Sequence, residues 1–130
     1  MNKLNRFFAA ALAAVAVMFA AGAQAHHSVA PFDRNNPVTL SGTVKEFKYT
    51  NPHTWIYLMV PDGKGGEQQW ELEGGSVNMV VRQGWTNKTL GPGMKVKLLI
   101  APRRDGNIGG EWLRVLELEG KPFEVKSDAQ

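Results

Sequence analysis

The sequence contains no cysteine, and this absence removes several classes of chemistry at once. There can be no disulfide framework, no thiol nucleophile and no thiolate metal site. The chain has 130 residues, and the 105 that follow its first 25 are enough to form a hydrophobic core without disulfide bonds. The length predicts one globular domain and leaves no room for two.

The sequence also lacks an excess of charge of one sign once its first residues are set aside. The full chain has 15 basic and 12 acidic residues. Removal of a segment that contains Lys3 and Arg6 leaves 13 basic against 12 acidic residues. A nucleic-acid-binding domain normally shows a basic patch or stripe, whereas the remaining lysines and arginines are scattered in pairs. We therefore expect no nucleic-acid partner.

The one long hydrophobic run is too short for a typical membrane span. It extends from Phe7 to Gly22, about 16 residues, whereas a transmembrane helix needs roughly 20. A basic start, this run and small residues at Ala23 and Ala25 are typical of a secretory signal peptide. Cleavage after Ala25 is predicted, with a retained membrane anchor as the alternative. The mature protein is then expected to be periplasmic, monomeric and without a transmembrane segment.

After the signal peptide, glycine and proline separate short runs of alternating apolar residues, which is typical of a β-rich domain. Residues 26–37 show no period and are expected to form an extended lead-in. Strands are expected at about residues 38–49, 54–60, 68–73, 94–101 and 112–118, followed by a flexible tail over residues 121–130. In the first strand, Val38, Leu40, Gly42 and Val44 are predicted to face inward, with Gly42 at a bend or bulge.

A short helix is predicted between the third and fourth strands. Ser76 suits its N-cap, Gly84 follows its end, and Val77, Val80 and Val81 fall on one face. The fold class is therefore mostly β, a five-stranded OB-like Greek-key barrel over residues 38–120. Another small barrel or a sandwich stays open, because strand order cannot be read from periodicity. The core is expected to include Val44, Trp70, Leu72, Val96, Leu98 and Val115.

Several short motifs follow one another in a fixed order along the mature chain. They are His26-His27-Ser28, Phe32-Asp33, Pro37 to Val44, Asn51-Pro52-His53, Gly84-Trp85-Thr86 and Arg104-Asp105-Gly106. Together they resemble a family of small exported bacterial proteins that is catalogued as a domain of unknown function. The resemblance covers nearly the whole mature chain and implies a periplasmic OB-like barrel, but it implies no activity and no catalytic residue. Members often carry Ser-Pro where this chain has Ser76-Val77, a departure that affects only the helix start.

The histidines, His26, His27 and His53, are the chemically suggestive feature, because all lie outside the predicted strands. Cleavage after Ala25 makes His26 the first residue, whose α-amine and ring Nδ1 can chelate one metal ion together. A third nitrogen from His27 or His53 would complete the nitrogen-rich set that Cu(II) favours, with zinc or nickel as weaker candidates. His53 falls in the first inter-strand loop, which borders the usual ligand-binding face of OB-folds.

A structural interpretation competes with metal binding. His26 and His27 would then form a polar terminal segment, and His53 would be a turn residue whose ring bonds a backbone carbonyl. The domain would act as an envelope interaction protein that binds a peptide, glycan or protein partner on the open face of its barrel.

Catalysis has little support in the sequence. Glu71 and Glu73 share one strand face and could act as an acid–base pair, but solvent-facing strand carboxylates are commoner. No nucleophile elbow, phosphate loop or zinc-protease motif occurs. A copper oxidase built on His26 is a minor alternative. We therefore expect a binding module and not an enzyme, with no catalytic residue and no cofactor other than the metal.

Overall fold

The computed structural model describes residues 31–124 as a mostly β fold with one short helix. Its elements are β1 (Val38–Lys48), β2 (Trp55–Pro61), β3 (Glu67–Glu73), α2 (Val77–Arg82), β4 (Lys95–Pro102), β5 (Gly110–Leu118) and β6 (Lys121–Pro122). The first five strands and the helix lie within a few residues of their predicted positions. No helix in this part of the chain is both long and apolar enough to cross a bilayer. The predicted signal peptide, residues 1–25, falls outside the described residues.

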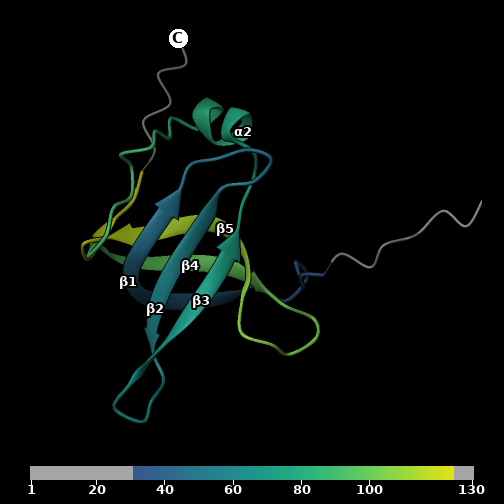
Figure 1. Ribbon diagram of the computed structural model, residues 1–130, viewed down its shortest axis with the longest axis vertical. Helices are drawn as coiled ribbons and strands as arrows, with labels where there is room; N and C mark the ends of the chain where they lie inside the picture. Colours follow the sequence, from purple (N-terminus) through teal and green to yellow (C-terminus); the bar gives the residue numbers. More distant parts are fainter. Residues whose placement is uncertain (1–30, 125–130) are drawn as a thin grey trace, which may run out of the picture.

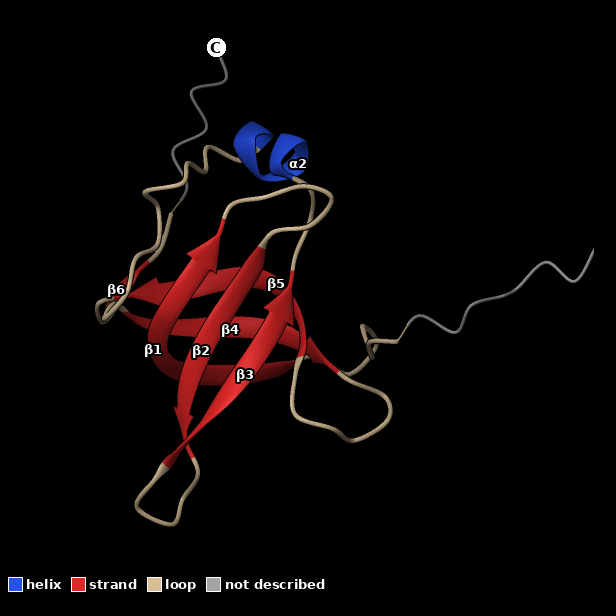
Figure 2. Ribbon diagram, viewed as in Figure 1, coloured by secondary structure: helices blue, strands red, loops and turns tan. Residues whose placement is uncertain are grey.

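One sheet contains all six strands, in the order β3-β2-β1-β4-β5-β6. Neighbours in that order pair antiparallel. In addition, β3 pairs in parallel with β5, through Leu72 opposite Gly110 and Glu73 opposite Glu111. In Figure 1, β1, β2 and β3 cross in front of β4 and β5, and α2 lies beyond one end of the strands. Figure 2 shows the same two crossing sets of strands, joined by long loops.

The first strand serves both sets because of a glycine in its middle. The first half of β1 pairs with β4 and its second half with β2, and Thr43 pairs with both. A Cβ on Gly42 would collide with the carbonyl oxygen of Met59 on β2, so the close approach of these strands depends on glycine. A register shift follows between Val44 and Glu46, close to the predicted bend.

The core is apolar and contains the residues that alternation predicted. Buried side chains include Val44, Leu72, Val96, Leu98 and Val115, and the partly buried Trp70 packs against them. One predicted inward position is wrong, and one residue of the predicted helix face is exposed. Val38 is 44% exposed, because β2 flanks β1 only from Thr43 onward. Val81 is 51% exposed, because a helix of six residues buries only the face that carries Val80.

The ends of α2 follow the predicted capping pattern. The Ser76 side chain accepts a hydrogen bond from the backbone N–H of Met79, which satisfies one free donor of the first turn. Gly84 has a φ of 81° just after the helix, a conformation that favours glycine. The next residue, Trp85, donates its N–H back to the carbonyl of Val80 at 3.1 Å. These bonds set where the helix begins and ends.

The prediction that the tail begins at residue 121 is wrong. Lys121–Pro122 form a sixth strand, β6, which pairs with the end of β5. The N–H of Phe123 donates to the carbonyl of Leu116 at 3.0 Å, and its ring lies 5.5 Å from that of Trp85. No strand is predicted here because a two-residue strand is too short to show a period. The ordered sheet therefore extends past the predicted boundary.

Candidate functional site

His53 lies in the loop between β1 and β2, and its ring contacts the end of β3. Nδ1 of His53 lies within ion-pair distance of Oε1 of Glu73, the last residue of β3. The His53 side chain is 48% exposed and that of Glu73 is 24% exposed. A carboxylate on Nδ1 favours the tautomer that carries its proton there. The other ring nitrogen, Nε2, is then left with a lone pair that can bind a ligand.

Hydrogen bonds to the segment after β3 hold the loop that carries this histidine. Oδ1 of Asn51 accepts from the N–H of Val77 at 3.0 Å, which joins the loop to the start of α2. Thr54 is fully buried, and both its N–H and its hydroxyl donate to the carbonyl of Gly75 at 2.9 Å. The N–H of Gly74 returns a bond of 2.8 Å to the carbonyl of Thr54. The β1–β2 loop and the β3–α2 connection therefore form one frame.

A cavity of about 430 Å³ opens beside the imidazole–carboxylate pair. It is lined by Pro31, Phe32, Arg34, Pro52, His53, Glu73, Gly74, Gly75, Ser76, Met79 and Glu111. Its wall thus combines an imidazole, two carboxylates, a guanidinium, a hydroxyl and a thioether with apolar and glycine surface. This volume is within the usual range for small-ligand sites.

The second carboxylate in this wall is already paired. Nε and Nη2 of Arg34 donate to the two oxygens of Glu111 at 2.7 and 2.5 Å, a bidentate pair that raises the pKa of Arg34. Glu73 lies opposite Glu111 in the strand register, but its partner is the histidine. Within residues 31–124, no three His, Cys, Asp or Glu side chains gather into a group that could hold a metal ion.

The lead-in enters the described part of the chain at this same cavity. The carbonyl of Pro31 accepts from the N–H of Arg104 at 2.9 Å, and the N–H of Asp33 donates to the carbonyl of Pro102 at 2.8 Å. The side chain of Asn36 donates to Asp33, and this bond holds the pKa of the Asp33 carboxyl below its usual range. The carboxylate form of Asp33 is thus favoured in the folded chain. The stability that the folded chain gains from this ionised group is present above a pH of about 4 and is lost as the pH falls through the lowered pKa.

His26 and His27, the other two predicted ligands, lie outside the described residues. They precede Pro31 by five and four residues. His53 is the only predicted ligand whose surroundings can be described. It occupies the predicted loop and contacts Glu73, one of the two strand carboxylates that the sequence places on a shared face.

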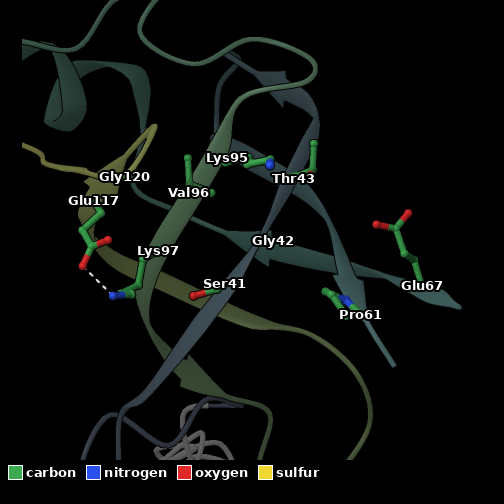
Figure 3. A pocket seen from close by; sticks show the side chains of 10 residues that line it. All are labelled: Ser41, Gly42, Thr43, Pro61, Glu67, Lys95, Val96, Lys97, Glu117 and Gly120. Atoms are coloured by element: carbon green, nitrogen blue, oxygen red, sulfur yellow. Dashed lines mark hydrogen bonds and ion pairs between the residues drawn. The ribbon is translucent and has the colours of Figure 1, made fainter. Parts of the chain in front are cut away.

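A second hollow, of about 380 Å³, lies over β1 and β4 and contains no histidine. Figure 3 shows Lys97 and Glu117 on one side of it, joined by a contact of 2.5 Å, and Glu67 with Pro61 on the other. The Lys97–Glu117 ion pair neutralises part of the charge in this hollow. None of the predicted metal ligands lines the hollow. We therefore take the cavity beside His53 as the candidate site.

A comparison with known families assigns most of the chain. Residues 12–112 match a family described as a family of unknown function (DUF6152). The chain belongs to this family. The matched segment contains all three histidines and Glu73, and it supports the part of the resemblance that concerned a domain of unknown function. No curated protein and no solved structure matches the chain.

Sequence reasoning missed Glu73 as the partner of His53 and Met79 as a residue that lines the cavity. Glu71 and Glu73 share a strand face, as predicted, but Glu71 is exposed whereas Glu73 is half-buried beneath the β1–β2 loop. The position of Glu73 at the very end of a strand, next to a loop with a histidine, was the available clue. Met79 lies in the first turn of α2, on a side of the helix that borders the cavity.

Gly74 separates Glu73 from Gly75 and has no room for a side chain. A Cβ there would collide with Nε1 of Trp112 and lie 2.6 Å from the hydroxyl of Thr54, both buried. We expect Gly74→Ala to lower the free energy of unfolding by about 1–3 kcal/mol, the usual cost of overpacking a core. Urea unfolding followed by tryptophan fluorescence measures the change.

Gly91→Ala is the matched control, since the nearest atom to a Cβ at Gly91 is 3.9 Å away. Its stability should be unchanged or slightly higher, because alanine restricts the unfolded chain. Equal unfolding midpoints for the Gly74 and Gly91 variants would contradict the close packing around Thr54.

Proposed function

We propose that this chain is an exported periplasmic module that binds copper as Cu(II), with Zn(II) or Ni(II) as weaker ligands. The proposed ligands are the α-amine and ring of His26, with His53 as the third nitrogen and His27 as its possible substitute. The observation that carries the proposal is the His53–Glu73 pair on the wall of a cavity that the lead-in also lines. Protein-bound metals commonly use an imidazole whose other nitrogen is held by a carboxylate.

The distance between the lead-in and the cavity is compatible with this ligand set. Pro31 and Phe32 line the cavity and are anchored to the end of β4. Four residues of extended chain span at most about 14 Å. We propose that this length lets His27, and His26 one residue further, approach the cavity that His53 lines.

The ligand chemistry favours copper over harder ions. An N-terminal histidine offers a six-membered chelate through its α-amine and ring Nδ1, and metal binding displaces the protons of both nitrogens. A set dominated by imidazole and amine nitrogens suits Cu(II) best and Ni(II) or Zn(II) next. A carboxylate behind His53 strengthens the imidazole as a donor.

The strand pairings support the proposal that the domain is an OB-like barrel. The ring β3-β2-β1-β4-β5, completed by the β3–β5 pairing, has the helix between the third and fourth strands. OB-folds bind ligands next to the loop between their first two strands and the loop between their last two. His53 lies in the first of these loops, and Glu111 follows the second.

A binding role is proposed in preference to catalysis, although Ser76 shares the cavity with His53 and Glu73. A serine hydrolase would need the hydroxyl to bond the imidazole. Within residues 31–124, the Ser76 hydroxyl bonds the N–H of Met79 and makes no bond to His53. Ser76 therefore acts as a helix cap. An envelope protein that binds a peptide, glycan or protein partner remains the competing proposal.

The role of Glu73 provides a direct test. Glu73→Gln keeps the size of the side chain but weakens the hold on Nδ1 of His53. We expect Cu(II) affinity, measured by calorimetry on protein that starts at His26, to fall by about 10–100-fold, the usual cost of losing such a partner.

Glu71→Gln is the matched control. It removes the same charge two residues away, at a residue that is exposed and outside the cavity. It should leave Cu(II) affinity unchanged. Equal losses in both variants would indicate a general charge effect and would count against His53 as a ligand.

A further inference from the structure

Met79 places a sulfur atom on the wall of the candidate site. It lies in the first turn of α2, the residue is 57% exposed, and it lines the cavity together with His53 and Glu73. Among the residues that line this cavity, Met79 is the only one with sulfur. The other methionines of residues 31–124, Met59 and Met94, lie elsewhere in the sheet and core.

A glycine makes room for this thioether. A Cβ on Gly75 would lie 3.3 Å from Sδ of Met79, which is tighter than ordinary contact, so Sδ lies close against the backbone of Gly75. The carbonyl of Gly75 in turn accepts both hydrogen bonds from Thr54, the residue after His53. The thioether and the imidazole are therefore attached to the same hydrogen-bonded frame.

The two donors differ in the oxidation state of copper that they prefer. A thioether is a soft ligand that selects Cu(I), whereas an imidazole binds copper in either state. The amine of His26 and nearby carboxylates suit Cu(II). A site that combines them can bind either ion as supplied, with the amine and carboxylates suited to Cu(II) and the sulfur to Cu(I).

We propose that this cavity also binds Cu(I), with the thioether of Met79 and the imidazole of His53 as ligands. The inference rests on the proposed Cu(II) site and adds a ligand that is specific to the reduced ion. No electron transfer by the protein is involved, since either ion is bound as supplied.

Met79→Leu tests this inference because it keeps the volume of the side chain and removes only the sulfur. Cu(I) affinity is measured on the processed protein, without oxygen, by competition with a coloured Cu(I) chelator. Loss of an outer-shell partner already costs about 10–100-fold, so loss of this ligand should lower Cu(I) affinity by at least about tenfold. Cu(II) affinity should be unchanged. The reduction potential of the bound copper should fall by about 59 mV for each tenfold selective loss.

Met59→Leu is the control, since Met59 lies on β2 away from the cavity, and it should change neither affinity. Unchanged Cu(I) affinity in Met79→Leu, with Cu(II) binding that still needs His26 and His53, would overturn this inference alone. Equal losses for both ions would also overturn it, because a soft ligand must act selectively. Failure of the parent protein to bind either ion would refute the proposed function itself.

Discussion

One extra residue placed before His26 is expected to abolish tight Cu(II) binding. The extension leaves every side chain in place, but it converts the α-amine into an amide, which has no lone pair for a metal at neutral pH. His26→Ala should be equally damaging, because it removes the ring of the same chelate. Both changes should lower Cu(II) affinity by more than the roughly 10–100-fold that is lost when a group supporting a metal ligand is removed. Calorimetric titration of the processed and extended proteins measures the difference.

The matched control carries one extra residue after Gln130, at the other end of the chain. It should bind Cu(II) as the parent protein does. Intact mass of the exported parent protein must correspond to a chain that begins at His26. A mass that retains residues 1–25 would exclude the chelate, and with it the copper proposal.

His53→Ala is the second change with a large expected effect. If His53 supplies the third nitrogen, its loss should lower Cu(II) affinity by at least about tenfold. If His27 can replace it, the loss will be smaller than that caused by His26→Ala. Folding should be unaffected, because the side chain is half exposed and the loop is held by Asn51 and Thr54.

A double-mutant cycle separates the role of His53 from that of Glu73. Glu73 is proposed to act only by holding the imidazole, so His53→Ala with Glu73→Gln should bind Cu(II) no more weakly than His53→Ala alone. Additive losses would mean that Glu73 binds the metal independently. Undiminished binding in His53→Ala would remove the cavity from the site and favour a partner-binding role.

Local patterns predicted most of the fold. Alternation located Leu98 and Val96 in one strand, and Ser76 and Gly84 marked the ends of the helix, because capping and burial act over a few residues. The pairing of β3 with β5 could not be predicted, since it joins segments that are distant in the sequence. The two-residue β6 was too short to leave a pattern.

The candidate site was predicted only in part, for the same reason. The loop position of His53 follows from Asn51-Pro52, which ends the first strand locally. Its contact with Glu73 depends on the register of β2 with β3, in which Trp55 lies opposite Glu73. The proximity of Met79 depends on how the β3–α2 connection folds back over Thr54. Neither the β2–β3 register nor the path of the β3–α2 connection produces a periodic pattern in the sequence, so neither could be predicted from it.

The most direct test of the central claim is a nuclear magnetic resonance titration of isotopically labelled, processed protein with Cu(II). Paramagnetic Cu(II) broadens the signals of nuclei close to it. At one equivalent of copper, signals of His53, Glu73 and the residues that line their cavity should disappear, whereas those of Lys95 and Lys97 in the second hollow should persist. Broadening that misses His53, or that spreads evenly over exposed carboxylates, would contradict the proposed site.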